Sequence, residues 1–175
     1  EMHELVDPNA AKILLKNPIS DDMAVMRSSL WPGLIQTAKS NIRRGHHNAR
    51  FFELGQCFSG TSVADQVQKI AGIICGNRYD SQWSENEREV DFFDAKSDVQ
   101  ALLFHSKSEY AFEAADHPAL QMGQSAKIMK GSELIGWIGA LSPKLQKALS
   151  MPNSFLFEID QKSIDQGEIS CYEPF

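Results

Sequence analysis

The side chains in this sequence that could carry out chemistry are mostly histidines and carboxylates, and few are spaced to act together. His46 and His47 could bind a metal ion, but adjacent strand residues point to opposite faces and this pair follows Gly45, which ends a helix. A solvated turn is the favoured interpretation. His117 could place an imidazole at a sheet edge, but no cysteine or serine nucleophile is near it, so we expect a structural role.

An acidic run could bind a divalent cation through its carboxylate oxygens. A polar loop that enters a helix N-terminus explains the same charges by solvation and by their interaction with the helix dipole, and we favour that explanation over a metal site. The run consists of Glu85, Glu87, Glu89, Asp91 and Asp94.

Several common site motifs are absent from the sequence: a glycine-rich phosphate loop, G-x-S-x-G, H-E-x-x-H and paired C-x-x-C. Aromatic side chains could stack on bases, but most of them fall on apolar stripes, so a core position is the expectation for Trp31, Trp83 and Trp137. The net charge of −6 would repel a phosphate backbone, and we do not expect this chain to grip nucleic acid alone.

Length and composition predict one globular domain over residues 1–175, with a polar tail from about residue 165. No apolar run approaches the roughly 18 residues that a membrane span needs, and the first residues do not resemble an export signal. The three cysteines, Cys57, Cys75 and Cys171, are odd in number and far apart, which favours a reducing cytoplasm.

Hydrophobic periodicity predicts the elements that must position these residues. Helices are predicted over 30–44, over 92–103 with Asp91 and Asp94 as its cap, and from Ser142 to Leu149, with some helical character over 8–15. Strands are predicted over 51–58, 69–75, 110–114 and 155–159, with a hairpin of 125–130 and 133–138 around Gly131. This order predicts an α+β fold in which helices flank a mixed, mostly antiparallel sheet.

Several short motifs, in a fixed order over nearly the entire chain, resemble the beta subunit of bacterial phenylalanyl-tRNA synthetase. They include Asn17-Pro18-Ile19-Ser20, Met26-Arg27-Ser28-Ser29-Leu30, Phe52-Glu53-Leu54-Gly55, Gly76-Asn77-Arg78 and Val90-Asp91-Phe92-Phe93-Asp94. The resemblance implies a fragment of a longer subunit: its class II synthetase-like core module, which in that family does not catalyse. ATP and magnesium would then belong to the alpha subunit of a cytoplasmic alpha2-beta2 enzyme, and this module would bind no cofactor. The enzyme would bind tRNA through other modules.

The same resemblance places substitutions where class II enzymes hold ATP. Those enzymes bind the α-phosphate with an arginine, since a fixed guanidinium stabilises the developing charge. Aligning Glu53 with the glutamate of that motif places Phe51 at the arginine. Further along, Glu158 and Asp160 replace glycines and Ser163 replaces a second arginine.

A non-catalytic module would serve as a surface for the alpha subunit to pack against. Two segments combine arginine or aromatic anchors with turn residues and are the expected interface. Their candidate residues are Asn17, Pro18, Met26, Arg27, Asn77, Arg78 and Trp83. An alternative is that Arg27 and Arg78 form ordinary intradomain ion pairs.

Two further functions remain open from the sequence. One is a self-sufficient ATP-dependent ligase or acyltransferase, with a site assembled from His117, Glu53 and Arg27. The other is a tRNA-gripping module, which would bind RNA with a steep dependence on salt.

Overall fold

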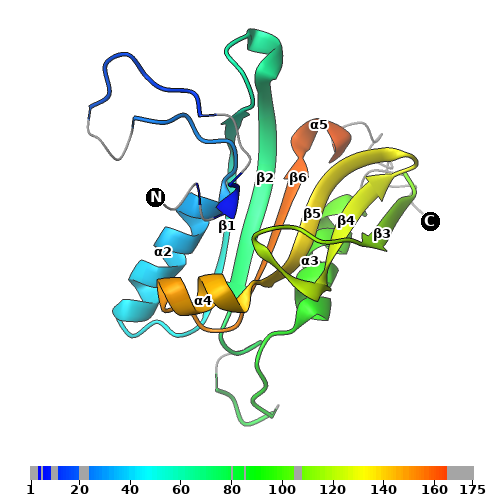
Figure 1. Cartoon of the computed structure of the whole chain (residues 1–175). Coiled ribbons are helices and arrows are strands. Elements are labelled where there is room, and N and C mark those ends of the chain that lie inside the picture. Colours follow the sequence, from blue (N-terminus) through cyan, green and yellow to red (C-terminus); the bar gives the residue numbers. More distant parts are fainter. Residues whose placement is uncertain are drawn as a thin grey trace, which may run out of the picture.

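One six-stranded sheet organises the computed structural model, which describes residues 4, 6–8, 12–19, 24–79, 81–84, 86–104 and 108–164. All five pairings between neighbouring strands are antiparallel, in the order β1-β2-β6-β5-β4-β3 (Figure 1). The strands are β1 (Ala49–Phe58), β2 (Gln66–Cys75), β3 (Tyr110–Ala114), β4 (Leu120–Lys130), β5 (Glu133–Leu141) and β6 (Ser154–Asp160). The predicted α+β class is confirmed, and the described part of the sheet has no parallel pair.

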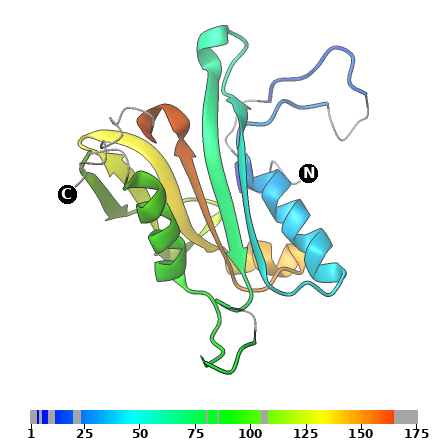
Figure 2. The same cartoon turned by 180° about the vertical axis from the view of Figure 1, so that it is seen from behind.

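The helices are α2 (Trp31–Arg43), α3 (Phe92–Leu103), α4 (Pro143–Leu149) and the short α5 (Gln161–Ile164), with a 3-10 turn, η2 (Val63–Asp65), between β1 and β2. The first three confirm the predicted helices to within about a residue. Helices α2 and α4 lie on one face of the sheet and α3 lies on the other (Figures 1 and 2). Within the described part of the chain, no helix has the length and apolarity that a membrane crossing requires.

The period-2 alternation of the strands supplies both faces of the sheet with a core. On the α2 side, Ala71 and Ile73 of β2 and Leu156 of β6 pack with α2 and α4. On the α3 side, Ile74 and Phe157 pack with α3. The prediction that the second strand is buried on both faces is confirmed for its last five residues.

The predicted helical character of residues 8–15 is wrong where the structure describes it. Residues 12–15 are extended: Leu14 and Val25 form an isolated antiparallel bridge, and Leu15 N donates to Ala24 O at 2.9 Å. The segment forms an arm that stands away from the sheet (Figure 1). Pro18 follows within the arm, and backbone pairing with the returning segment replaces the helix. The predicted polar tail, residues 165–175, lies outside the described residues.

Helix α3 packs against β5 and β6 and leaves most of β1 uncovered on that face (Figure 2). Two apolar side chains of β1 are therefore exposed on that face, Phe52 at 79% and Leu54 at 50%. Both lie on an edge strand, where backbone groups are also open to another chain.

Candidate functional site

A polar cluster on the α2 side of the sheet is built around the carboxylate of Glu158 in β6. Its Oε1 accepts hydrogen bonds from Ser29 Oγ and Leu30 N, both at 2.8 Å, and its Oε2 accepts one from Lys69 Nζ at 2.7 Å. Burial acts to lower the pKa of Lys69, but the charge and the hydrogen bond of Glu158, together with other nearby acidic groups, outweigh burial, so this pKa is raised. Both oxygens of this carboxylate are therefore engaged in hydrogen bonds within the module.

The same carboxylate changes how helix α2 begins. Leu30 is the N-cap residue and makes no side-chain cap hydrogen bond, but Ser29 Oγ just before it accepts a hydrogen bond from Trp31 N at 3.1 Å. Glu158 also binds Ser29 Oγ and the next backbone amide, so the negative charge that favours a helix N-terminus comes from β6. The cluster therefore ties α2 to the centre of the sheet.

Arg27 lies across β1 on the same face. Its Nη1 donates to Glu53 Oε1 at 2.6 Å and its Nε donates to Gln56 O at 2.8 Å. The guanidinium crosses so close to Gly55 that a side chain at that position would collide with it. Glycine is required here to let Arg27 approach the strand.

His117 occupies a small pocket of about 150 Å³ next to Lys69 and Glu158. Its ring meets the edges of Trp31 and Trp137, with centroid distances of 5.1 and 4.9 Å. Burial lowers the pKa of His117, and its Nδ1 accepts a hydrogen bond from Ala119 N at 3.2 Å. The imidazole thus serves as a packing and turn-forming group.

The self-sufficient enzyme needs His117, Glu53 and Arg27 together. The structure joins Arg27 to Glu53 as an ion pair, but neither residue is among the described residues that line the pocket of His117. The positions aligned with the synthetase arginines hold no cation: Phe51 packs against the core, and the Ser163 side chain is buried. Burial raises the pKa of Asp160, which replaces one of the aligned glycines.

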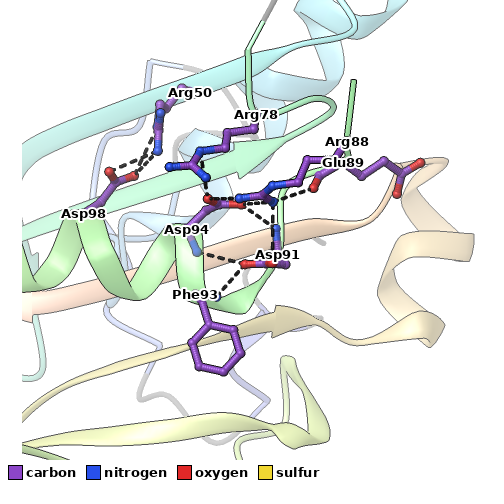
Figure 3. A network of polar contacts seen from close by, with 8 residues as sticks. All are labelled: Arg50, Arg78, Arg88, Glu89, Asp91, Phe93, Asp94 and Asp98. Atoms are coloured by element: carbon purple, nitrogen blue, oxygen red, sulfur yellow. Dashed lines mark hydrogen bonds and ion pairs between the residues drawn. The ribbon is translucent and has the colours of Figure 1, made fainter. Parts of the chain in front are cut away.

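A second polar network joins α3 to β1 and to the loop after β2 (Figure 3). Arg88 donates twice to Asp94, both at 2.7 Å, and Arg78 Nε lies 3.4 Å from the same carboxylate. Asp94 also accepts from Asp91 N at 3.0 Å, so Asp91 and Asp94 form the predicted capping box. The bond from Arg88 holds the pKa of Asp94 below its ordinary value.

Arg50 and Arg78 line a pocket of about 300 Å³. Arg50 binds both oxygens of Asp98 at 3.1 Å, and Arg78 pairs with Asp94 (Figure 3). The two guanidinium groups are therefore neutralised within the module. Among the described residues, which exclude Glu85, no group of three acidic, histidine or cysteine side chains could hold a metal ion.

The residues predicted to meet a partner subunit fall into two groups at opposite ends of β1 and β2. Asn17 and Pro18 are exposed on the arm, and Met26 and Arg27 are half-buried where it returns. Beyond the other end of β2, Asn77 is half-buried, Arg78 is exposed and Trp83 is fully exposed. Ten strand residues separate the groups by about 30 Å, so they cannot form one compact cluster. Their role at an interface stays a prediction.

The core position expected for the tryptophans is wrong for Trp83, because the loop after β2 carries it into solvent. Trp31 is buried and Trp137 packs against the α2-side core.

His46 and His47 are exposed just beyond Gly45, whose φ of 91° ends α2. Cys57 and Cys75 are buried free thiols, and burial raises the pKa of Cys57 to about 12.

Sequence reasoning missed the exposed apolar face formed by Phe52 and Leu54. A signal was present: Phe51, Phe52 and Leu54 place apolar residues on both faces of one strand. Such a strand either lies in the centre of the sheet with both faces buried, or lies where one of its apolar faces is left for a partner to cover. Only the strand order, which puts β1 at the edge of the sheet, shows that the second case applies.

Comparisons with known proteins agree with this fold. Residues 1–161 match the family model described as the phenylalanyl tRNA synthetase beta chain CLM domain. The phenylalanine–tRNA ligase beta subunits of Nitrosococcus oceani and Coxiella burnetii are 41% and 40% identical to the chain, each over 99% of it. The chain spans only 22% of the length of these relatives.

A solved structure, that of the pyrrolysyl tRNA synthetase PylSc of Desulfitobacterium hafniense, matches with a TM-score of 0.60 at 14% identity. The match covers 87% of this chain and 51% of that one, and it shows that the fold is that of a class II synthetase core. By the family match and by these relatives, the chain belongs to the phenylalanyl-tRNA synthetase beta chain CLM-domain family.

Proposed function

We propose that this chain is a non-catalytic module of a phenylalanyl-tRNA synthetase beta subunit and packs against the alpha subunit. In this proposal the alpha subunit binds ATP and magnesium and attaches phenylalanine to tRNA, in the cytoplasm and within an alpha2-beta2 assembly. The observation that carries the proposal is that the cations lying on the sheet itself, on its α2 side, are bound to carboxylates of the same module. Arg27 is paired with Glu53, and Lys69 with Glu158.

Adenylate formation needs fixed positive charge at the phosphates of ATP. Arg27 and Lys69, which lie on the sheet itself, are already neutralised, and binding a triphosphate there would first require breaking the Lys69–Glu158 pair. That pair is largely buried, with side-chain exposures of 23% and 11%, so separating it leaves an uncompensated charge and is costly. The freed carboxylate would then repel the phosphates.

The surface that we propose for the alpha subunit is the exposed side of β1 that bears Phe52 and Leu54. An obligate interface is comparatively apolar, and exposed large apolar residues on a sheet edge are unusual in a protein that works alone. The fully exposed Trp83 in the loop beyond β2 is a further anchor of the type that interfaces use. Arg27 and Arg78 serve mainly as intradomain ion-pair residues in this view.

Calorimetric titration of the purified chain with magnesium-ATP and with phenylalanine tests the absence of a ligand site. We expect no binding heat for either ligand up to millimolar concentration. The alternative, a self-sufficient ATP-dependent ligase or acyltransferase, requires binding in the micromolar range. Such binding of either ligand would contradict the proposal.

A further inference from the structure

Basic residues are unevenly distributed along this acidic chain. Residues 23–52 and 134–157 contain seven of the 17 lysines and arginines and none of the 23 aspartates and glutamates. Two histidines, His46 and His47, lie in the first of these segments. The two segments therefore carry a formal charge of +7, and the rest of the chain carries −13.

The fold brings the two acid-free segments together. Leu34 and Ile35 of α2 share one core with Leu145 and Leu149 of α4. The two helices lie side by side on the same face of the sheet in both views (Figures 1 and 2). Their outward sides, together with the turn after α2, form what we call the basic face, made of Arg43, Arg44, His46, His47, Lys144 and Lys147.

The four lysines and arginines of the basic face are exposed, and within the described residues none of them takes part in an ion pair. Other cations of the module differ: Arg27, Arg50, Lys69, Arg78 and Arg88 are each paired with a carboxylate. The basic face thus keeps its charge available to an external anion.

The chemistry of the face favours phosphate over protein as its partner. None of the large apolar residues exposed among the described residues lies on α2, on the turn after it or on α4. A protein interface needs a desolvated apolar centre, whereas a phosphate backbone is bound by exposed lysine and arginine side chains alone. The absence of exposed phenylalanine, tyrosine or tryptophan there also indicates contacts to the backbone rather than stacking on bases.

We propose that the basic face contacts the phosphate backbone of tRNA when the chain is part of its synthetase. This inference rests on the proposed function, since it requires the assembled enzyme. The overall negative charge does not oppose it, because at physiological salt charges act over only about 8 Å and the local cations dominate. The contacts would add affinity without reading sequence.

Charge reversal in the assembled full-length enzyme tests the proposal. Two variants reverse charges on the basic face: Arg43→Glu/Arg44→Glu and Lys144→Glu/Lys147→Glu. The control, Lys16→Glu/Lys162→Glu, makes the same change of charge at exposed positions elsewhere. We expect each face variant to weaken tRNA binding about tenfold or more in filter binding at 0.1 M salt. The dependence on salt should also become weaker: the magnitude of the slope of log affinity against log salt should decrease by roughly 1.5, the value for two lost phosphate contacts.

A neutral variant, Arg43→Gln/Arg44→Gln, avoids placing negative charge at the C-terminus of α2 and should lower the slope by a similar amount. Pyrophosphate exchange and co-purification with the alpha subunit should be unchanged in every variant. Affinity and slope equal to those of the Lys16→Glu/Lys162→Glu control, with assembly intact, would overturn the proposal. Loss of assembly in the face variants alone would instead assign the face to a protein contact and also overturn it. Failure of the unsubstituted subunits to assemble would count against the proposed function itself.

Discussion

Glutamate in place of both Phe52 and Leu54 is expected to separate the parent beta subunit from the alpha subunit. Association should weaken by about a hundredfold or more, because buried aromatic and aliphatic anchors of an interface contribute around 2 kcal/mol or more each. The module itself should stay folded, since Phe52 is 79% and Leu54 50% exposed. Sedimentation or gel filtration of the co-expressed subunits measures the association.

A matched control is available on the same face of β1 and of its neighbour β2. Gln56 and Gln68 are exposed polar residues that pair across β1 and β2, and Gln56→Glu/Gln68→Glu adds the same charge. We expect this control to assemble nearly normally. If the Phe52→Glu/Leu54→Glu protein co-purifies with the alpha subunit as well as the control does, the proposed interface is wrong.

Asparagine at position 94 is expected to lower the free energy of unfolding by about 3 kcal/mol. Asp94 is buried, accepts two hydrogen bonds from Arg88, faces Arg78 and completes the cap of α3 through Asp91 N (Figure 3). The amide loses the charge-assisted bonds and half of the capping box, which are each worth roughly 1 to 3 kcal/mol. Urea denaturation of both proteins at pH 7 measures the difference.

Asp98→Asn is the matched control, because Asp98 lies one turn further along α3 and is also bound bidentately by an arginine. Its ion pair with Arg50 is exposed, at 35% and 51%, and exposed pairs contribute less than about 1 kcal/mol. Equal effects of the two substitutions would show that burial of Asp94 is unimportant and would contradict the account.

The pH dependence of the Asp94→Asn effect follows from the lowered pKa of Asp94. The carboxylate is favoured in the folded state, so its contribution is complete above the unfolded value of 3.8 and is lost as pH falls through the lower folded value. The difference between wild type and Asp94→Asn should therefore shrink below pH 4. A difference that grows with acidity would be inconsistent with this electrostatic role.

Local patterns in the sequence predicted the elements of the fold well. The stripe of Trp31, Leu34 and Ile35 predicts α2, and Asp91 with Asp94 predicts the start of α3, since periodicity and caps depend on residues only a few positions apart. The motif resemblance extended this to the class II core.

Long-range features could not be predicted in the same way. The carboxylate at the start of α2 comes from Glu158, 128 residues away, and no local spacing indicates that contact. The exposure of Phe52 depends on β1 being an edge strand, which is a property of the strand order. The solvent position of Trp83 depends on where the loop after β2 travels, so composition alone assigned it wrongly to the core.

The central claim is that two ion pairs on the α2 side of the sheet, Arg27–Glu53 and Lys69–Glu158, hold the module together and take no part in catalysis. Its most direct test is phenylalanine-dependent pyrophosphate exchange by the assembled enzyme carrying Arg27→Gln/Glu53→Gln in this module. Both partners of the ion pair become neutral amides of similar shape, so little destabilisation is expected. We predict a kcat/KM within about twofold of wild type, whereas a loss of a hundredfold or more, typical of removing a group that stabilises the transition state, would contradict the account.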